Sequence, residues 1–96
     1  ITFNDPELYE KMLPSLKRIN GSGNVNSMNA ITGAEDFSFF QEKVPGMYFF
    51  IGGAKKGTDP AKAAPHHTPD FYVDDSAMIT GLRSMTTLAL DYLIKN

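Results

Sequence analysis

The first apolar pattern along the chain has helical spacing. It begins after Asn4-Asp5-Pro6, where Asp5 can cap free backbone donors and Pro6 suits the first helical position. Pro14 inside the pattern should kink the helix, and Asn20-Gly21 should end it. We therefore predict a kinked helix over residues 6–20, whose apolar face is formed by Leu8, Met12, Leu16 and Ile19, widened by Tyr9 and Leu13.

The second pattern is an uninterrupted apolar run at Met47–Ile51, which predicts a strand. Continuous apolarity is typical of a strand that is covered on both faces. A weaker pattern over Val25–Ile31 is compatible with another short strand. Between these two segments, Glu35–Val44 predicts a short helix that ends at Pro45-Gly46, with Phe37, Phe40 and Val44 on its apolar side.

The last third of the chain combines a long loop with a long helix. Ala54–Asp70 holds three prolines, and long loops without secondary structure are often functional. Phe71–Val73 should be briefly extended. A helix capped by Asp74 or Asp75 should then run to Lys95, with its apolar stripe at Met78, Leu82, Met85, Ala89 and Tyr92 or Leu93. Gly81 within that helix indicates close packing at this position.

Together these elements predict an α/β fold in which helices pack on a partial mixed sheet. A strand as apolar as Met47–Ile51 needs a covering layer on each face and neighbours on both edges. The 96 residues offer too few strands to supply them. The chain also begins with isoleucine and not with methionine. We therefore expect it to be part of a larger domain.

Composition narrows the possible functions. The formal net charge is -2 and the pI is near 5.5, so no basic face is available for nucleic acid. Cysteine is absent, which excludes disulfides and thiolate metal sites and fits a cytoplasmic location. The longest apolar run has five residues, too few to cross a membrane. No secretory signal pattern opens the chain.

The first candidate for chemistry is Pro65-His66-His67-Thr68-Pro69. Imidazole binds Zn²⁺ and similar ions well, and a ligand held by stiff backbone loses little freedom on binding. In an extended segment the two histidines would point to opposite sides, so one metal ion would take only one of them. Spacing alone favours two solvent-facing loop histidines, because no further ligands lie nearby in the sequence.

The second candidate is Gly33-Ala34-Glu35-Asp36-Phe37 at a predicted helix start. Its backbone N–H groups could receive an anion, and the two acids could act as acid or base. Acids in a first helical turn also complement the helix dipole without any active site, and we favour that interpretation for them. We assign the aromatic residues to a core rather than to a ligand pocket: Phe37, Phe39, Phe40, Tyr48, Phe49 and Phe50.

Taken in order, these motifs resemble the C-terminal end of the M20 metallopeptidases. The resemblance covers nearly the whole chain and is carried by Gly33–Phe40, Lys43–Gly52, His67-Thr68-Pro69-Asp70-Phe71 and the final helix. It is greatest to the amidohydrolase branch, which includes hippurate hydrolases, N-acyl-amino-acid deacylases and auxin-conjugate hydrolases. It implies that residues 1–96 form the C-terminal segment of a larger α/β/α catalytic domain, without its N-terminal portion and lid domain.

The resemblance also implies roles for individual residues. His67 occupies the position of the family's last metal ligand, whereas Gly33, Ala34 and Glu35 would line the substrate end. The expected cofactor is a pair of divalent ions, Zn or Mn, which would activate water for hydrolysis of an N-acyl amino acid or small peptide-like amide. The other ligands and the general base are absent from this chain, so it contains no catalytic residue of its own.

The resemblance further implies which partners the chain has. The expected ones are the small amide substrate, the remainder of its own catalytic domain and, in the intact enzyme, further copies in a homo-oligomer; neither nucleic acid nor a membrane is expected. The isolated chain should be inactive. The alternative is a stand-alone small α/β binding or interaction module without catalysis. A well-folded, cooperative monomer would support that alternative, whereas self-association or a molten state would oppose it.

Overall fold

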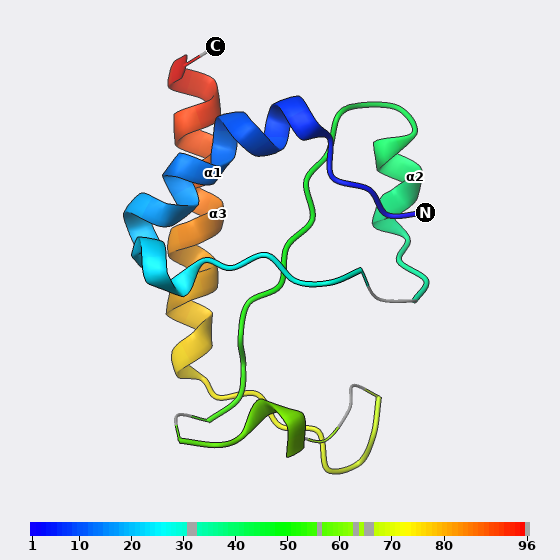
Figure 1. Ribbon diagram of the computed structural model, residues 1–96, viewed down its shortest axis with the longest axis vertical. Helices are drawn as coiled ribbons and strands as arrows, with labels where there is room; N and C mark the ends of the chain where they lie inside the picture. Colours follow the sequence, from blue (N-terminus) through cyan, green and yellow to red (C-terminus); the bar gives the residue numbers. More distant parts are fainter. Residues whose placement is uncertain (31–32, 56, 63, 65–66, 96) are drawn as a thin grey trace.

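The computed structural model describes residues 1–30, 33–55, 57–62, 64 and 67–95 (Figure 1). In this part of the chain the regular elements are all helical: α1 (Pro6–Asn20), η1 (Ser22–Asn24), α2 (Phe37–Gln41), η2 (Pro60–Lys62) and α3 (Ser76–Lys95). Helices α1 and α3 pack against each other, and α2 lies on the opposite side of the molecule (Figure 1). Long connecting segments join these two regions.

Helix α1 begins and ends where the sequence predicts. The Asp5 carboxylate accepts a hydrogen bond from the Leu8 amide at 2.9 Å, and Pro6 occupies the first helical position. At the other end Gly21 has a φ of 86°, a left-handed value that suits glycine. Pro14 lies inside the helix, and Figure 1 shows α1 bending along its length, as expected for an internal proline.

The contact between α1 and α3 combines a small apolar core with a polar seam. Met12 and Leu16, 4% and 6% exposed, are buried as the sequence predicts. Beside them the Ser15 hydroxyl donates to the Asp91 carboxylate, which also accepts from the Arg18 guanidinium at 2.8 Å. Further along, the Asn20 amide donates to the Ser84 hydroxyl at 3.0 Å. These directional contacts fix how the two helices are aligned.

The face of α3 that packs on α1 is not its apolar stripe. Ser84, 1% exposed, faces α1, and so does Asp91 through its two hydrogen bonds. The large residues of the predicted stripe are exposed instead, with fractions of 60–73%: Met78, Leu82, Met85 and Leu93. The predicted apolar stripe is therefore not the face of α3 that packs on α1. Small side chains let two helices approach closely, which explains why the other face packs on α1.

The predicted sheet is not formed in the described residues, which contain no strand. Met47–Ile51 runs without a ladder partner, and residues 25–30 of the other predicted strand are irregular, while Ile31 lies outside the described residues. The Asn4 side chain takes the place of a neighbouring strand, since its amide donates to the Tyr48 carbonyl at 3.0 Å and accepts from the Tyr48 amide at 2.7 Å. A strand needs neighbours for its backbone groups, and these residues do not supply them.

Helix α2 is shorter than predicted, five residues instead of the expected 35–44. After Gln41 the chain turns, with the Val44 amide donating to the Phe40 carbonyl at 3.0 Å. The Gln41 side chain then ties this turn to the N-terminal segment by bonds to the Phe3 amide and carbonyl at 3.1 and 2.7 Å. This tie holds α2 and the N-terminal segment together.

The molecule is more open than a folded protein of its size. Its radius of gyration is 14.6 Å, against about 12.5 Å for a compact domain of this length. Its accessible surface is 7905 Å², against about 5,500 Å² for a compact protein of this mass. Within the described residues, no helix is long and apolar enough to cross a lipid bilayer.

Candidate functional site

His67 belongs to the connection between η2 and α3. This connecting segment lies at the end of the molecule opposite the C-terminus (Figure 1). Its side chain is exposed and its backbone has a φ of 63°. His67 is therefore not extended, and the segment turns after it, with the Phe71 amide donating to the Thr68 carbonyl at 3.1 Å. His66 lies outside the described residues.

The left-handed backbone of His67 is unusual for a residue with a side chain. It costs roughly 1 kcal/mol relative to a helical or extended conformation, although histidine tolerates it better than most residues. Such conformations cluster at functional sites, where the surrounding structure imposes them. The sequence predicts a stiff loop here because of its prolines, but it does not reveal this turn.

The described residues do not fit a complete metal site. No group of three or more His, Cys, Asp or Glu residues comes together in them. A stable site for Zn²⁺ or a similar ion requires three or four ligands, so a single imidazole cannot hold one. The family-based expectation of a pair of metal ions therefore requires ligands from elsewhere.

Residues 33–35 lie before α2, away from the loop that carries His67 (Figure 1). Gly33 and Ala34 are exposed, and so is Glu35. The Glu35 carboxylate accepts a hydrogen bond from the Tyr48 hydroxyl at 3.0 Å and a long one from the Phe37 amide at 3.4 Å. The Glu35–Tyr48 hydrogen bond links residues 33–35, the predicted substrate end, to the apolar run Met47–Ile51. The sequence gives no signal for the pair, since the two residues are thirteen positions apart.

The backbone donors at the start of α2 are already used within the chain. The Ser38 amide donates to the Glu35 carbonyl at 3.1 Å, and the Phe39 amide donates to the Asp36 carbonyl at 3.0 Å. With the Phe37 amide directed to the Glu35 carboxylate, this turn has no ready cradle for an anion. The exposed groups that it offers to a ligand are the carboxylates of Glu35 and Asp36.

Tyr48 connects Glu35 to a cluster of aromatic rings. Its ring centroid lies 5.7 Å from that of Phe37 and 5.5 Å from that of Phe50, spacings typical of favourable aromatic pairs. The hydrogen bond to Glu35 raises the pKa of the Tyr48 hydroxyl, and burial and the negative charge of Glu35 act in the same direction. Tyr48 therefore remains protonated to higher pH than an isolated tyrosine.

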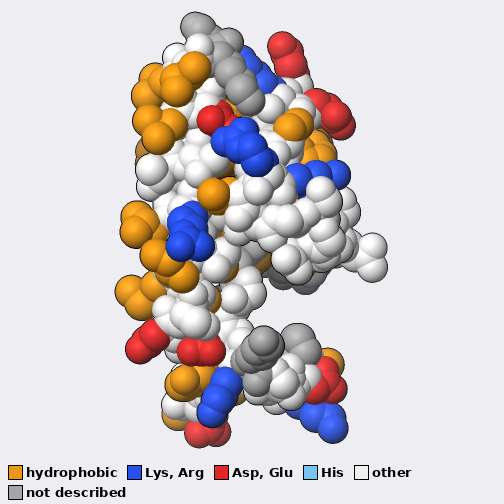
Figure 2. All heavy atoms as spheres, turned by 90° about the vertical axis from the view of Figure 1, so that its left-hand side faces the viewer, with side chains coloured by type: hydrophobic (Ala, Val, Ile, Leu, Met, Phe, Trp, Pro, Cys, Tyr) orange, Lys and Arg blue, Asp and Glu red, His pale blue; other side chains and the backbone are white. Residues whose placement is uncertain are grey.

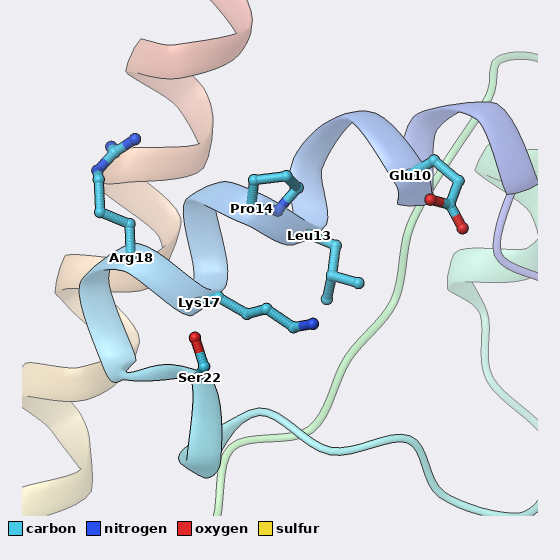
Figure 3. Close-up of a pocket in the computed structure, with 6 residues that line it drawn as sticks. All are labelled: Glu10, Leu13, Pro14, Lys17, Arg18 and Ser22. Atoms are coloured by element: carbon cyan, nitrogen blue, oxygen red, sulfur yellow. The ribbon is translucent and has the colours of Figure 1, made fainter.

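A separate groove of about 410 Å³ lies along α1. Figure 3 shows it between the outer side of α1 and the start of η1, lined by Glu10, Leu13, Pro14, Lys17, Arg18 and Ser22. The Arg18 guanidinium is paired with Asp91. The groove contains neither His67 nor residues 33–35.

Comparison with known proteins identifies the family. The peptidase family M20/M25/M40 matches residues 1–91 of this chain. The chain belongs to that family. Membership confirms the predicted resemblance, which the sequence motifs carry from Gly33 to the final helix. No solved structure matches the chain.

Three of the curated proteins similar to this chain are hydrolases by name. Thermostable carboxypeptidase 2 of Saccharolobus solfataricus is 36% identical over 94 residues, which cover 96% of this chain and 22% of the relative. IAA-amino acid hydrolase ILR1-like 4 of Arabidopsis thaliana is 32% identical over 98% of this chain and 21% of the relative. Putative amidohydrolase YhaA of Bacillus subtilis is 28% identical over 93% of this chain and 22% of the relative. The M20 chain described here thus spans about a fifth of the length of these relatives.

Proposed function

We propose that this chain is the C-terminal segment of the catalytic domain of a metal-dependent amidohydrolase that cleaves N-acyl amino acids or small peptide-like amides. The observation that carries the proposal is the family match over residues 1–91. The names of the relatives support the reaction class, because a carboxypeptidase and an amino-acid conjugate hydrolase both cleave an amide-type bond. A cytoplasmic location and a homo-oligomeric intact enzyme are further predictions.

His67 is proposed to supply one metal-ligand nitrogen. The family resemblance implies that it occupies the position of the last ligand, and its exposed side chain stands on a turn with a left-handed backbone. The remaining donors have to come from another part of the polypeptide, since the described residues offer no cluster. The isolated chain is therefore proposed to be inactive.

Gly33, Ala34 and Glu35 are proposed to contact the substrate. The absence of a side chain at Gly33 and the small one at Ala34 leave room for a ligand beside the backbone. Apart from its chain neighbours, no heavy atom of the described residues lies within 4 Å of a Cβ placed on Gly33. The Glu35 carboxylate is exposed and can accept a hydrogen bond from an amide N–H of the substrate. Its bond from Tyr48 holds it in one orientation.

The test is an assay of the intact hydrolase that contains this segment, with hippurate and N-acetyl amino acids as substrates and Zn²⁺ or Mn²⁺ present. His67→Ala should abolish or severely reduce turnover and lower the metal content of the purified enzyme, because one ligand is lost. His66→Ala is the matched control and should do less. Equal mild effects of the two variants would refute the role of His67.

The isolated chain provides the second test. With either metal present it should show no turnover of these substrates, because neither the general base nor the other ligands are among its residues. Turnover at rates typical of enzymes would overturn the proposed inactivity. Family membership already argues against the alternative of a binding module unrelated to any hydrolase.

A further inference from the structure

The outer face of α3 carries a continuous apolar stripe that nothing in the described chain covers. We define the α3 stripe as Met78, Leu82, Met85, Ala89 and Leu93, which recur at intervals of three and four residues and so lie on one side of the helix. Met78 is 70% exposed, Leu82 63%, Met85 60% and Leu93 73%. In Figure 2 hydrophobic side chains follow one long edge of the molecule.

The α3 stripe is separate from the surface that joins α3 to α1. That surface contains Ser84 and Asp91, whose polar contacts with α1 fix the helix in place. Helix α3 therefore has one face that is already packed and a second face, richer in large apolar residues, that is open. A helix that is packed on one side and carries large apolar residues on another is typical of a position inside a protein layer and not at its surface.

We propose that the α3 stripe is the surface on which the remainder of the hydrolase catalytic domain packs. This inference rests on the proposed function and specifies the residues through which the partner is bound. The chain spans only 20–22% of the length of the first relatives compared with it. The rest of such a hydrolase is therefore several times larger than this chain and can supply an apolar layer.

The size of the α3 stripe argues against a second copy of the chain as the occupant. Fifteen residues separate Met78 from Leu93, so the stripe is about 22 Å long. At a helix width of about 10 Å it offers roughly 220 Å², whereas a stable interface buries about 800 Å² on each partner. A layer of the same domain avoids this limit, because packing within one polypeptide does not pay the translational and rotational cost of joining two molecules.

The charges on α3 argue against a membrane surface. Helices that lie on membranes carry several Lys or Arg residues on their polar face. The helix sequence contains two basic residues, Arg83 and Lys95, together with the acidic Asp91. An apolar protein surface therefore fits the α3 stripe better than an anionic lipid surface does.

Two methionines in the α3 stripe make a direct test possible. Oxidation of methionine to the sulfoxide by hydrogen peroxide follows solvent exposure, and mass spectrometry reads it at each residue. In the isolated chain Met78 and Met85 should oxidise at rates close to that of a free methionine derivative, whereas the buried Met12 should react slowly. In the intact hydrolase both should slow by about tenfold or more, because the partner surface excludes the peroxide.

The outcomes of the oxidation experiment separate the possible occupants. Fast oxidation of Met78 and Met85 in the intact hydrolase would overturn the proposal. A second possible result is that Met78 and Met85 stay reactive in the monomeric hydrolase but become protected when the concentration of the isolated chain is raised. This result would assign the α3 stripe to a second copy instead. Protection of the two methionines only after vesicles of anionic phospholipid are added would assign the α3 stripe to a membrane surface. Assignment to a second copy or to a membrane would reject the proposal.

A pair of variants provides an independent measurement. Leu82→Lys places a charge on the α3 stripe, whereas Thr86→Lys adds the same charge to an exposed position beside it. In the intact hydrolase Leu82→Lys should lower the thermal unfolding midpoint and Leu82→Met should largely restore it, because a buried charge is costly and methionine keeps the volume. Thr86→Lys should leave the midpoint nearly unchanged.

These results are distinguishable from a failure of the proposed function. If the intact protein hydrolysed none of the amides, protection of Met78 and Met85 would still support the packing of the α3 stripe. If the protein were an active hydrolase and Leu82→Lys behaved like Thr86→Lys, the packing proposal would fail while the proposed function stood.

Discussion

At the scale of single residues, the contact between Glu35 and Tyr48 connects a predicted substrate contact with the aromatic cluster. Tyr48 is held from two sides, since the Asn4 amide bonds both of its backbone groups and its hydroxyl donates to Glu35. The result is a carboxylate of defined orientation on an exposed segment. A substrate-binding acid benefits from such support, because less side-chain freedom is lost when the ligand binds.

The raised pKa of Tyr48 leads to a prediction about pH. In a spectrophotometric titration of the chain, Tyr48 should ionise above the ordinary tyrosine pKa. Its signal is the one that is missing from the titration of Tyr48→Phe. Because the folded pKa is the higher one, the contribution of the pair to stability is complete below the ordinary tyrosine pKa and is lost as the pH rises through the raised value. Glu35→Ala should return the pKa toward its ordinary value. Identical titrations of Glu35→Ala and the unaltered chain would contradict this.

At the scale of elements, the pairing of α1 and α3 depends on polar contacts as much as on apolar burial. Ser15 and Ser84 are almost completely buried, and each has a hydrogen-bond partner on the facing helix. A buried hydroxyl without a hydrogen-bond partner is costly. These contacts therefore make one alignment of the two helices more stable than alignments shifted along the helix axes. Apolar residues alone would specify the alignment less strictly.

Removing the shared acceptor of this seam should destabilise the helix pair. Asp91→Ala leaves the buried Ser15 hydroxyl without its acceptor, at an expected cost of about 1–3 kcal/mol. Arg18→Ala is the control and should cost less than about 1 kcal/mol, since the Arg18 side chain is 58% exposed. The midpoint of chemical unfolding, followed by helical circular dichroism, measures both. An equal loss in the two variants would assign the effect to the ion pair instead.

Gly81 offers a second prediction for α3. A Cβ at this position would lie 3.2 Å from the Cδ1 atom of Ile51, which confirms the predicted close packing. Ile51 is 39% exposed, so the end of its side chain can move aside. Gly81→Ala should therefore stabilise the chain by up to about 1 kcal/mol through helix propensity.

The matched control for this prediction is Gly53→Ala. A Cβ there would lie 3.0 Å from Val73, and the backbone is pinned because the Gly53 carbonyl accepts from the Asp74 amide at 2.7 Å. This variant should lose stability. The unfolding midpoints of the two variants are compared under the same conditions. A lower midpoint for Gly81→Ala would mean that the Ile51 side chain cannot move aside.

At the scale of the whole molecule, the chain has much apolar surface and little core. In the described residues Met12 and Leu16 are the buried large apolar side chains, while twenty large apolar side chains are exposed. The accessible surface exceeds that of a compact protein of the same mass by roughly 45%. Such a chain gains little from hydrophobic burial on folding.

The isolated chain should consequently unfold over a broad temperature range and bind a hydrophobic dye such as ANS. Calorimetry and dye fluorescence measure these two properties. The intact hydrolase, with its apolar layers covered, should unfold more sharply and bind less dye. A sharp, two-state transition of the isolated chain without dye binding would contradict the expectation and favour an independently folded module.

Local physical chemistry allowed the sequence to determine several features in advance. Asp5, Pro6 and Gly21 fix the ends of α1 through interactions with their immediate neighbours, so their roles can be predicted from the sequence alone. The length of α3 follows from a periodicity that extends to Lys95. The motifs from Gly33 to Phe71 indicated the family, and the comparison confirmed it.

Tertiary structure decided the features that depend on distant partners. Met47–Ile51 has the composition of a buried strand, but a ladder forms only if neighbouring strands are present, and the described residues supply none. The spacing of Met78, Leu82 and Met85 reveals an apolar face without saying what covers it, and α1 packs on the opposite, smaller face. The Glu35–Tyr48 contact joins separate segments, so no local pattern encodes it.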